Sequence, residues 1–388
     1  MSTSTAATST IQISEERETL MLAMELGEKG WLLGFSSAFG QKPLRRKIAS
    51  RDGEGLLAQV AWAKAKLGLV ADAPVASCYE AGRDGFWLHR FLLAHGVENL
   101  VVDSASIEVN RKKRRAKSDR IDVVALLDLL ARHRAGSAKP VWSVVHVPSP
   151  EDEDRRHLYR ELKLTKKDRT RVSHRIKGLL SNQGMTLDLR QDLRAQLGVM
   201  RKWDGSALQP GLRQRLERYI ADYEYFTNRI ARLEAERRRI LRKEQSPVLD
   251  QVLQLYSLKA VGINTAWVCV TELFGWRQFH NRKQVGSMTG LTPTPFDSGK
   301  ANREQGIGKD GSRWIRGAAI EFAWGWLRFQ PESELSKWYE RRFGQGSKRL
   351  RKIGIVALAR RLMIALWRYL ETGVLPEGAL LKTDLRIR

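Results

Sequence analysis

The stretch LMLAMELGEKGWLLGFSS, residues 20–37, has the pattern of two β-strands joined by a tight turn. Apolar residues fill both runs, and Gly27 and Gly30 enclose the short polar segment between them. A third and more basic run, PLRRKIAS at residues 43–50, continues the pattern. The sequence therefore predicts an antiparallel meander of three strands near the start of the chain.

Helices and short apolar strands alternate after this meander. Helical periodicity extends from Gly53 to Leu67, and the buried type of strand VASCY follows at residues 75–79. Next come a helix over Gly85 to Ala94, the strand NLVVD at residues 99–103, and the helix DVVALLDLLARH at residues 122–133. Three strands followed by strands separated by helices are typical of a ribonuclease H-like α/β sheet. Function must still be argued from the site.

The composition indicates a folded protein with a polyanionic partner. The 388 residues carry a formal net charge of +25, with 42% hydrophobic residues and 12 tryptophans. That apolar content excludes a disordered basic tail and is sufficient for two or three domains. Histones, ribosomal proteins and membrane-surface proteins share such a charge, so the charge alone does not identify the partner.

Cysteine usage and the N-terminal segment bear on the compartment. Only Cys78 and Cys269 occur, far apart, so the sequence encodes neither a disulfide framework nor a zinc site. The polar start lacks the apolar core of a signal peptide, and no apolar run reaches the roughly 18 residues of a membrane span. We expect a cytoplasmic, bacterial, nucleoid-associated protein that has no membrane contact.

The character of the sequence changes after Pro148 and Pro150. Two long, charged stretches at residues 151–182 and 210–245 are predicted helices, joined by a segment that contains WDGSALQPG. A narrow apolar stripe near heptad spacing predicts a helical hairpin or coiled coil that pairs with another helix or subunit, although a simple spacer is the alternative. The stripe comprises Leu158, Leu162, Leu164, Val172, Ile176 and Leu179 in the first helix and Leu216, Ile220, Tyr223, Ile230, Leu233 and Ile240 in the second.

A mostly helical segment rich in Gly and Trp begins near Leu255, and Gly262 lies between two of its predicted helices. Such a turn can present backbone N–H groups to a phosphate, or it is an ordinary corner between helices. The chain is therefore predicted to have four parts: a disordered tail at 1–17, a ribonuclease H-like domain at 18–148, a coiled-coil region at 149–246 and a C-terminal domain at 247–388.

Four carboxylates occupy the positions where such a sheet carries its chemistry. Glu25 ends the first strand, Glu80 ends the fourth, and Asp119 and Asp122 share one face at the start of the last helix. Magnesium or manganese prefers several oxygen ligands of this kind, and bound metal stabilises the oxygens of a phosphoryl transfer. Asp103 is a rival ligand that we interpret as a loop cap. Glu28 is an alternative to Glu25.

A cationic segment directly precedes the last two carboxylates. It reads RKKRRAKSDRIDV at residues 111–123. Acids near a helix N-terminus are also explained by the helix dipole, so this pattern alone is consistent with a solvated helix start. In the metal-site reading, the cations hold a phosphate backbone beside the acids. They are Arg111, Lys112, Lys113, Arg114, Arg115 and Lys117.

Three blocks of the chain, residues 24–35, 77–130 and 291–321, closely resemble a known family. They resemble the DEDD-type transposases of the insertion sequence one-ten family, in particular its eleven-eleven subgroup. The resemblance implies a ribonuclease H-like (RuvC-like) domain at 18–148, a coiled coil, and a mostly α-helical C-terminal transposase domain. The resemblance extends from about residue 20 to 375. Glu25 departs from the pattern of four acids, because the family has Asp there and the longer side chain makes the metal geometry less certain.

The resemblance implies a second chemical centre. In the family a C-terminal serine attacks DNA and becomes covalently attached to it, and Ser298 in PFDSGK matches that residue. A Ser-Gly pair after prolines is otherwise typical of a turn. A serine hydroxyl requires activation by a base or a metal, and neighbouring cations could neutralise phosphate oxygens. Those cations are Lys300, Arg303, Lys309, Arg313 and Arg316.

The resemblance also implies partners. These are target and donor DNA, a structured non-coding guide called the bridge RNA, and further copies of the chain that form dimers and then a tetramer. The sequence has abundant basic surface but no apparent helix that reads bases, as expected when base pairing selects the target.

Two other functions are compatible with the same residues. A hydrolytic nuclease or junction resolvase would use the carboxylates while Ser298 is structural, and would form no covalent intermediate. A non-catalytic RNA-binding or architectural protein would bind nucleic acid without magnesium-dependent cleavage. All three functions predict affinity that falls steeply with salt, so binding alone does not distinguish them.

Overall fold

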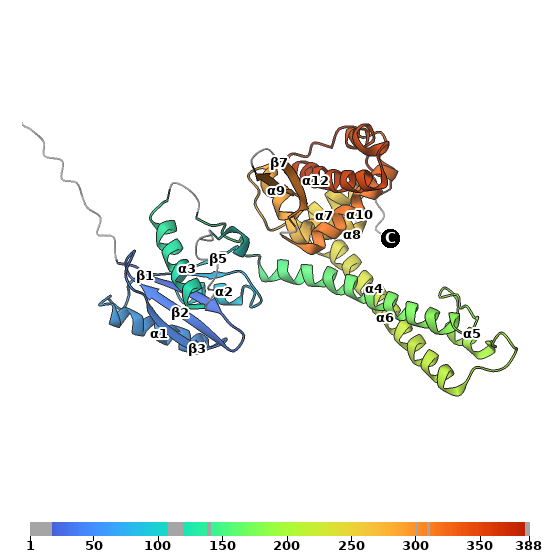
Figure 1. Ribbon diagram of the computed structural model, residues 1–388, viewed down its shortest axis with the longest axis horizontal. Coiled ribbons are helices and arrows are strands. Elements are labelled where there is room, and N and C mark those ends of the chain that lie inside the picture. The colour runs from blue at the N-terminus through green and yellow to red at the C-terminus, as the bar shows by residue number, and fades with distance from the viewer. Residues whose placement is uncertain (1–17, 108–118, 138–140, 299–300, 309–310, 385–388) are drawn as a thin grey trace, which may run out of the picture. The chain divides into compact units, whose positions relative to one another are not determined.

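The computed structural model describes residues 18–107, 119–137, 141–298, 301–308 and 311–384 (Figure 1). The chain divides into two compact units, Met1–Val147 and Pro148–Arg388. The predicted disordered tail at 1–17 lies outside the described residues. So do the six cations predicted to bind the phosphate backbone between Arg111 and Lys117, as well as Lys300 and Lys309.

The first unit is built on one mixed sheet of five strands in the order β3-β2-β1-β4-β5. The pairs β1–β2 and β2–β3 are antiparallel, whereas β4 is parallel to both β1 and β5. The prediction of a meander followed by helix-separated strands is therefore confirmed. The strands are β1 (Leu20–Leu26), β2 (Gly30–Ser36), β3 (Leu44–Ala49), β4 (Val75–Glu80) and β5 (Val97–Val102).

Helices cover both faces of this sheet, since alternate residues of each strand point to opposite sides. Leu20 and Leu22 of β1 share a core with α1 (Gly53–Lys66) and α2 (Trp87–Ala94). The sequence predicted that the helix after β4 starts at Gly85. Helix α2 starts two residues later, at Trp87, because the backbone of Gly85 has a φ of +68° and belongs to the turn before the helix.

The other face of the sheet packs against α3 (Asp119–Arg134). Met21 and Ala23 of β1 contribute to this core, together with Val123 and Leu127 of the helix. The contact is closest at Gly34 of β2, where an added Cβ would lie 2.2 Å from Val123 Cγ1 and 3.0 Å from Leu127 Cδ1. The missing side chain thus lets α3 approach the sheet.

We expect Gly34→Ala to lower the free energy of unfolding by about 1–3 kcal/mol, because the new methyl group overpacks a fully formed core. Urea unfolding followed by circular dichroism measures this change. Gly82→Ala is the matched control in the same unit, since its Cβ would have only the Glu80 carbonyl oxygen nearby, at 3.8 Å. Equal stability of the two variants would contradict the close packing of α3 on β2.

The second unit begins with two long helices, α4 (Pro150–Ser181) and α6 (Pro210–Lys243), which pack against each other. Ser149 caps α4, and a proline occupies the first turn of each helix, where its missing N–H is tolerated. The connection at residues 182–209 contains α5 (Leu193–Val199). Val172 and Ile176 of α4 share a core with Leu216 and Ile220 of α6, so the helices form an antiparallel hairpin.

One predicted member of the apolar stripe lies off the face that packs within this chain. Leu164 is 48% exposed, whereas Tyr159, Leu162 and Thr165 of the same helix are buried. A helix advances 100° per residue, so one face of α4 carries Leu158, Tyr159, Leu162 and Thr165. Leu164 points away from this face. Whether the hairpin is a true coiled coil stays a prediction.

The remaining helices form one large core around Trp267 and Trp326. They include two π-helical turns, η3 and η4, and a two-stranded antiparallel hairpin projects from this part. Among the described residues, no helix is long and apolar enough to cross a bilayer. The elements are α7 (Pro247–Ser257), α8 (Ile263–Cys269), η3 (Val270–Phe274), α9 (Arg282–Met288), β6 (Pro293–Ser298), β7 (Ala301–Ile307), α10 (Arg313–Phe329), α11 (Glu334–Tyr339), η4 (Glu340–Gly344) and α12 (Lys348–Thr372).

Candidate functional site

Glu25 and Glu80 lie next to each other at one edge of the sheet. The parallel register pairs Met24 with Tyr79, so Glu25 and Glu80 are the next residues on neighbouring strands, which run about 4.8 Å apart. Ala23 and Cys78, two residues earlier, belong to the core beneath α3. Because side chains alternate, both glutamates are placed on the α3 face.

Helix α3 runs antiparallel to these two strands. Cys78 Sγ lies 3.8 Å from the carbonyl oxygen of Leu126, and Met21 at the start of β1 lies beside Leu127 and Ala131. Glu80 lies two residues after Cys78 on β4, and Asp122 lies about one helical turn before Leu126 on α3. Both steps cover about 6 Å in the same direction. The helix start and the two glutamates therefore share one edge of the unit.

The structure does not test the complete set of four acids. Asp119 is the first residue of α3, but its side chain lies outside the described part of the chain. The side chains of Glu25, Glu80 and Asp122 are described, and among the described side chains no group of three or more Asp, Glu, His or Cys residues is arranged to hold a metal ion. The metal site therefore stays a prediction, supported by the backbone positions of its members.

The two rival acids are placed differently. Glu28, in the turn between β1 and β2, is exposed and forms an ion pair with Arg83 at 3.5 Å. The backbone of Asp103 pairs with the loops around it, because its amide donates to the Ser143 carbonyl and its carbonyl accepts from Ser106 Oγ at 2.7 Å. These bonds fit the predicted loop cap, while a ligand role for Asp103 is untested.

Arg83 is a residue that the sequence analysis missed. It follows β4 in the segment GRDG and also contacts Asp84 at 3.7 Å, so it joins the loop after β4 to the turn after β1. The sequence feature that could have indicated Arg83 is a cation three residues after Glu80, at the end of the fourth predicted strand. It places a described positive charge at the edge that carries Glu25 and Glu80.

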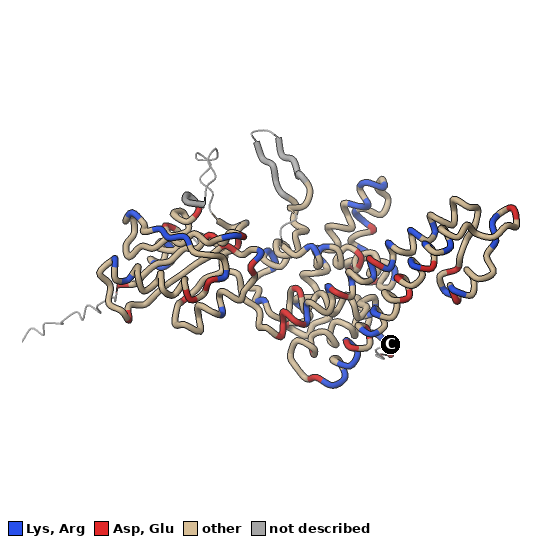
Figure 2. Tube along the Cα trace, turned by 90° about the horizontal axis from the view of Figure 1, so that it is seen from below, with Lys and Arg blue, Asp and Glu red and all other residues tan. Residues whose placement is uncertain are grey.

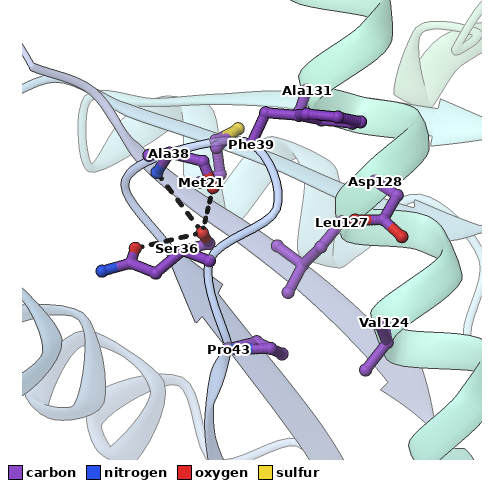
Figure 3. Close-up of a pocket in the computed structure, with 10 residues that line it drawn as sticks. Met21, Ser36, Ala38, Phe39, Pro43, Val124, Leu127, Asp128 and Ala131 are labelled. Atoms are coloured by element: carbon purple, nitrogen blue, oxygen red, sulfur yellow. Dashed lines mark hydrogen bonds between the residues drawn. The ribbon is translucent and has the colours of Figure 1, made fainter.

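A pocket in the same unit lies at the opposite end of β1 (Figure 3). Met21, Ser36 and Phe39 line it together with Leu127 and Asp128 of α3. Ser36 Oγ donates to the Ala38 carbonyl at 2.7 Å, which fixes the loop over the pocket. With one carboxylate and a mainly apolar lining, this pocket lacks the donor set of a metal centre.

Ser298, the predicted nucleophile, is the last residue of β6, and its backbone pairs with that of Ala301 of β7. Arg303 of β7 pairs with Phe296 on the same hairpin, and the side chains of these residues lie outside the described part. Arg313 begins α10, is exposed, and lies 5.1 Å from the Trp314 ring centroid, while Arg316 is one turn further. The β6–β7 hairpin and the first turn of α10 are thus neighbours in the sequence of the second unit.

A buried carboxylate lies beside the start of α10. Glu272 is 2% exposed, within η3, and both of its oxygens accept from Arg160 of α4, at 2.6 Å from Nε and 2.9 Å from Nη2. Ser312, the residue that caps α10, places its hydroxyl 3.5 Å from Glu272 Oε2. Burial lowers the pKa of the neighbouring Arg156, as does the positive charge of Arg160, whereas Glu272 opposes the shift.

This network of Glu272, Arg160 and Ser312 was not predicted from the sequence either. A single Glu inside the apolar run AWVCVTELFG was the available signal, since an unpaired buried carboxylate is costly and implies a cationic partner. The partner is 112 residues away in the sequence and could not be identified without the fold.

An acidic sheet edge in one unit, a serine hairpin in the other and a large excess of cations are features of an enzyme that acts on nucleic acid. Comparison with known proteins identifies the class as transposases. The sequence profile described as "Transposase IS116/IS110/IS902 family" matches residues 253–340, which include Glu272, the β6–β7 hairpin and all of α11.

Two relatives from Sinorhizobium fredii (strain NBRC 101917 / NGR234) extend this match. A protein named "Putative transposase y4rJ" is 38% identical over 382 residues, 94% of this chain and 95% of its own length. A second, "Putative transposase y4qE", is 26% identical over 288 residues, 73% of this chain and 66% of its own length. The chain belongs to the IS116/IS110/IS902 family of transposases.

Proposed function

We propose that this transposase breaks and rejoins DNA through a covalent phosphoserine intermediate, in a ribonuclease H-like unit and a serine-bearing unit that act together. The observation that carries the proposal is the convergence of Glu25, Glu80 and the start of α3 on one edge of the sheet. These positions come from three separate elements, and each holds an acid that the sequence analysis had selected.

The donor set fits magnesium or manganese. Glu25, Glu80, Asp119 and Asp122 would hold the ions through hard carboxylate oxygens. Bound metal would neutralise charge on the phosphate oxygens during phosphoryl transfer. Arg83 adds a positive charge at the same edge.

The chemistry at Ser298 is an exchange of esters. The hydroxyl oxygen attacks phosphorus and loses its proton, a phosphoserine ester forms, and the displaced deoxyribose oxygen takes up a proton. A deoxyribose hydroxyl of another strand then attacks the phosphoserine, which restores a phosphodiester and releases the serine. The number of phosphate ester bonds is conserved, so the exchange requires no external energy source.

The partners in this proposal are target DNA, donor DNA and a structured guide RNA, handled by an oligomer of the chain. Delegating target choice to base pairing fits a protein whose exposed cations suit backbone contacts. The hairpin of α4 and α6 would connect protomers in the assembled particle.

We expect Asp122→Asn to reduce DNA cleavage roughly a hundredfold or more, because the neutral amide no longer supplies a charged metal ligand. The assay incubates the full protein with guide RNA, DNA carrying an element junction, and MgCl₂, and measures cleaved strands on a denaturing gel. Glu25→Gln and Glu80→Gln should have the same effect, and EDTA should abolish cleavage by the wild type.

Asp128→Asn provides the matched control. It makes the same chemical change on the same helix, at the pocket away from the acidic edge, and should leave the cleavage rate within about twofold of the wild type. Equal activity of the Asp122 and Asp128 variants would refute the proposed metal site.

A further inference from the structure

Two regions of the second unit, the hairpin of α4 and α6 and the start of α12, differ in how many of their Lys and Arg residues form ion pairs with acids of the chain. Along the hairpin, Lys and Arg alternate with Asp and Glu (Figure 2), and many form ion pairs. Examples are Lys166–Glu234 at 2.6 Å, Arg229–Glu161 at 2.7 Å and Arg194–Glu224 at 2.7 Å. Much of the hairpin charge is therefore compensated within the chain.

The start of α12 has the opposite character. Residues 341–361 contain eight Lys and Arg and no acid. Only Arg341 among them forms an ion pair with a described acid, through Glu334 at 3.6 Å. Four exposed cations occupy the first two turns of the helix. Together with Arg342 of η4 and Arg361 further along α12, they form what we call the α12 cationic cluster: Arg342, Lys348, Arg349, Arg351, Lys352 and Arg361.

Packing places Arg342 of η4 near Arg361, which is itself a residue of α12. Phe343 of η4 fits against Gly354 of α12, where an added Cβ would lie 2.5 Å from the ring, so the adjacent Arg342 lies beside this helix. Arg361 stacks on Trp338 at 3.9 Å from the ring centroid. Burial lowers the pKa of Arg361, as do the positive charges of Arg360 and Arg342, in agreement with their proximity.

The shape of this region favours duplex DNA over RNA. Ser347 caps α12 after a glycine-containing turn, so the first two turns of the helix are exposed, with Leu350 and Ile353 solvent-accessible among the cations. The major groove of B-form DNA admits an α-helix with its phosphates on either side. The deep, narrow major groove of A-form RNA does not.

We propose that the α12 cationic cluster binds the phosphate backbone of duplex DNA, independently of the acidic edge and of Ser298. The surface would hold DNA without reading its sequence, as a second contact beside the reacting strands. Each cation that neutralises a phosphate releases a counterion, which makes the contribution measurable through its salt dependence.

The test replaces Lys348, Arg349, Arg351 and Lys352 by Gln in the full chain and measures binding to a random-sequence duplex of about 30 base pairs across a salt series. We expect at least tenfold weaker binding near 0.1 M salt. The slope of log affinity against log salt should also become smaller by roughly 3 to 4, since each lost phosphate contact removes about 0.9.

A matched variant separates this surface from general charge. Replacing Lys166, Arg194, Arg213 and Arg229, each of which forms an ion pair with an acid of the hairpin region, by Gln removes the same four charges and should change the slope by less than about 1. Equal losses for both variants would overturn the proposal. A larger loss for a structured RNA hairpin than for the duplex would overturn it as well.

Folding is checked by thermal unfolding of each variant. The charge-preserving Arg349→Lys/Arg351→Lys variant should bind the duplex like the wild type, and a loss of binding there would contradict a backbone contact. At saturating protein, cleavage by the cluster variant should persist, whereas failure of the proposed active site would abolish cleavage and leave duplex binding intact.

Discussion

Ser298→Ala is expected to eliminate the covalent protein–DNA product and to reduce strand exchange by about 10⁴-fold or more, because the attacking oxygen is removed. The measurement uses end-labelled DNA, guide RNA and MgCl₂, followed by a denaturing gel on which the adduct migrates with the protein. Binding of DNA before the reaction should be unchanged, since the substitution removes one hydroxyl group.

Ser287→Ala is the control for this experiment. Ser287 is exposed on α9 in the same unit, and its loss should leave adduct formation unaffected. An adduct formed by the Ser298 variant at the wild-type rate would place the nucleophile elsewhere. Equal cleavage by both proteins with no adduct would instead support the hydrolytic nuclease.

Arg160→Leu should lower the free energy of unfolding of the second unit by about 3–5 kcal/mol, because it leaves the Glu272 carboxylate buried without its cationic partner. Chemical denaturation measures this loss. The double variant Arg160→Leu/Glu272→Leu should recover most of the stability, since an apolar pair carries no desolvated charge.

Lys163→Leu gives a matched comparison on the same helix. Its ion pair with Glu321 spans 3.3 Å but is exposed on both sides, so the change should stay within about 1 kcal/mol. A double variant as unstable as Arg160→Leu alone would show that the arginine acts through packing and not through the buried charge.

The sheet was predictable because its signals are local. Alternating apolar residues and glycine turns define each strand, and the order of elements then fixes which strand ends meet. Glu25 and Glu80 were found in this way, since each is the acid at the end of a recognised strand. The start of α3 was predictable for the same reason.

Less of the second unit could be predicted from local sequence patterns. The strands β6 and β7 contain prolines and polar residues, so PTPFDS and ANREQGI show no apolar alternation. Ser298 was selected only through the resemblance to a known family. Glu272 and Arg160 are joined by tertiary packing between helices distant in the sequence, which no local pattern encodes.

The parallel pairing of β1 with β4 has a consequence for the nascent protein. Glu25 and Glu80 are 55 positions apart and become neighbours only after α1 has crossed between their strands, and such non-local pairing forms late in folding. A chain in which β4 has not yet paired with β1 already carries its positive charge but holds the two carboxylates apart, so it lacks the neighbouring acids on which the proposed metal site depends.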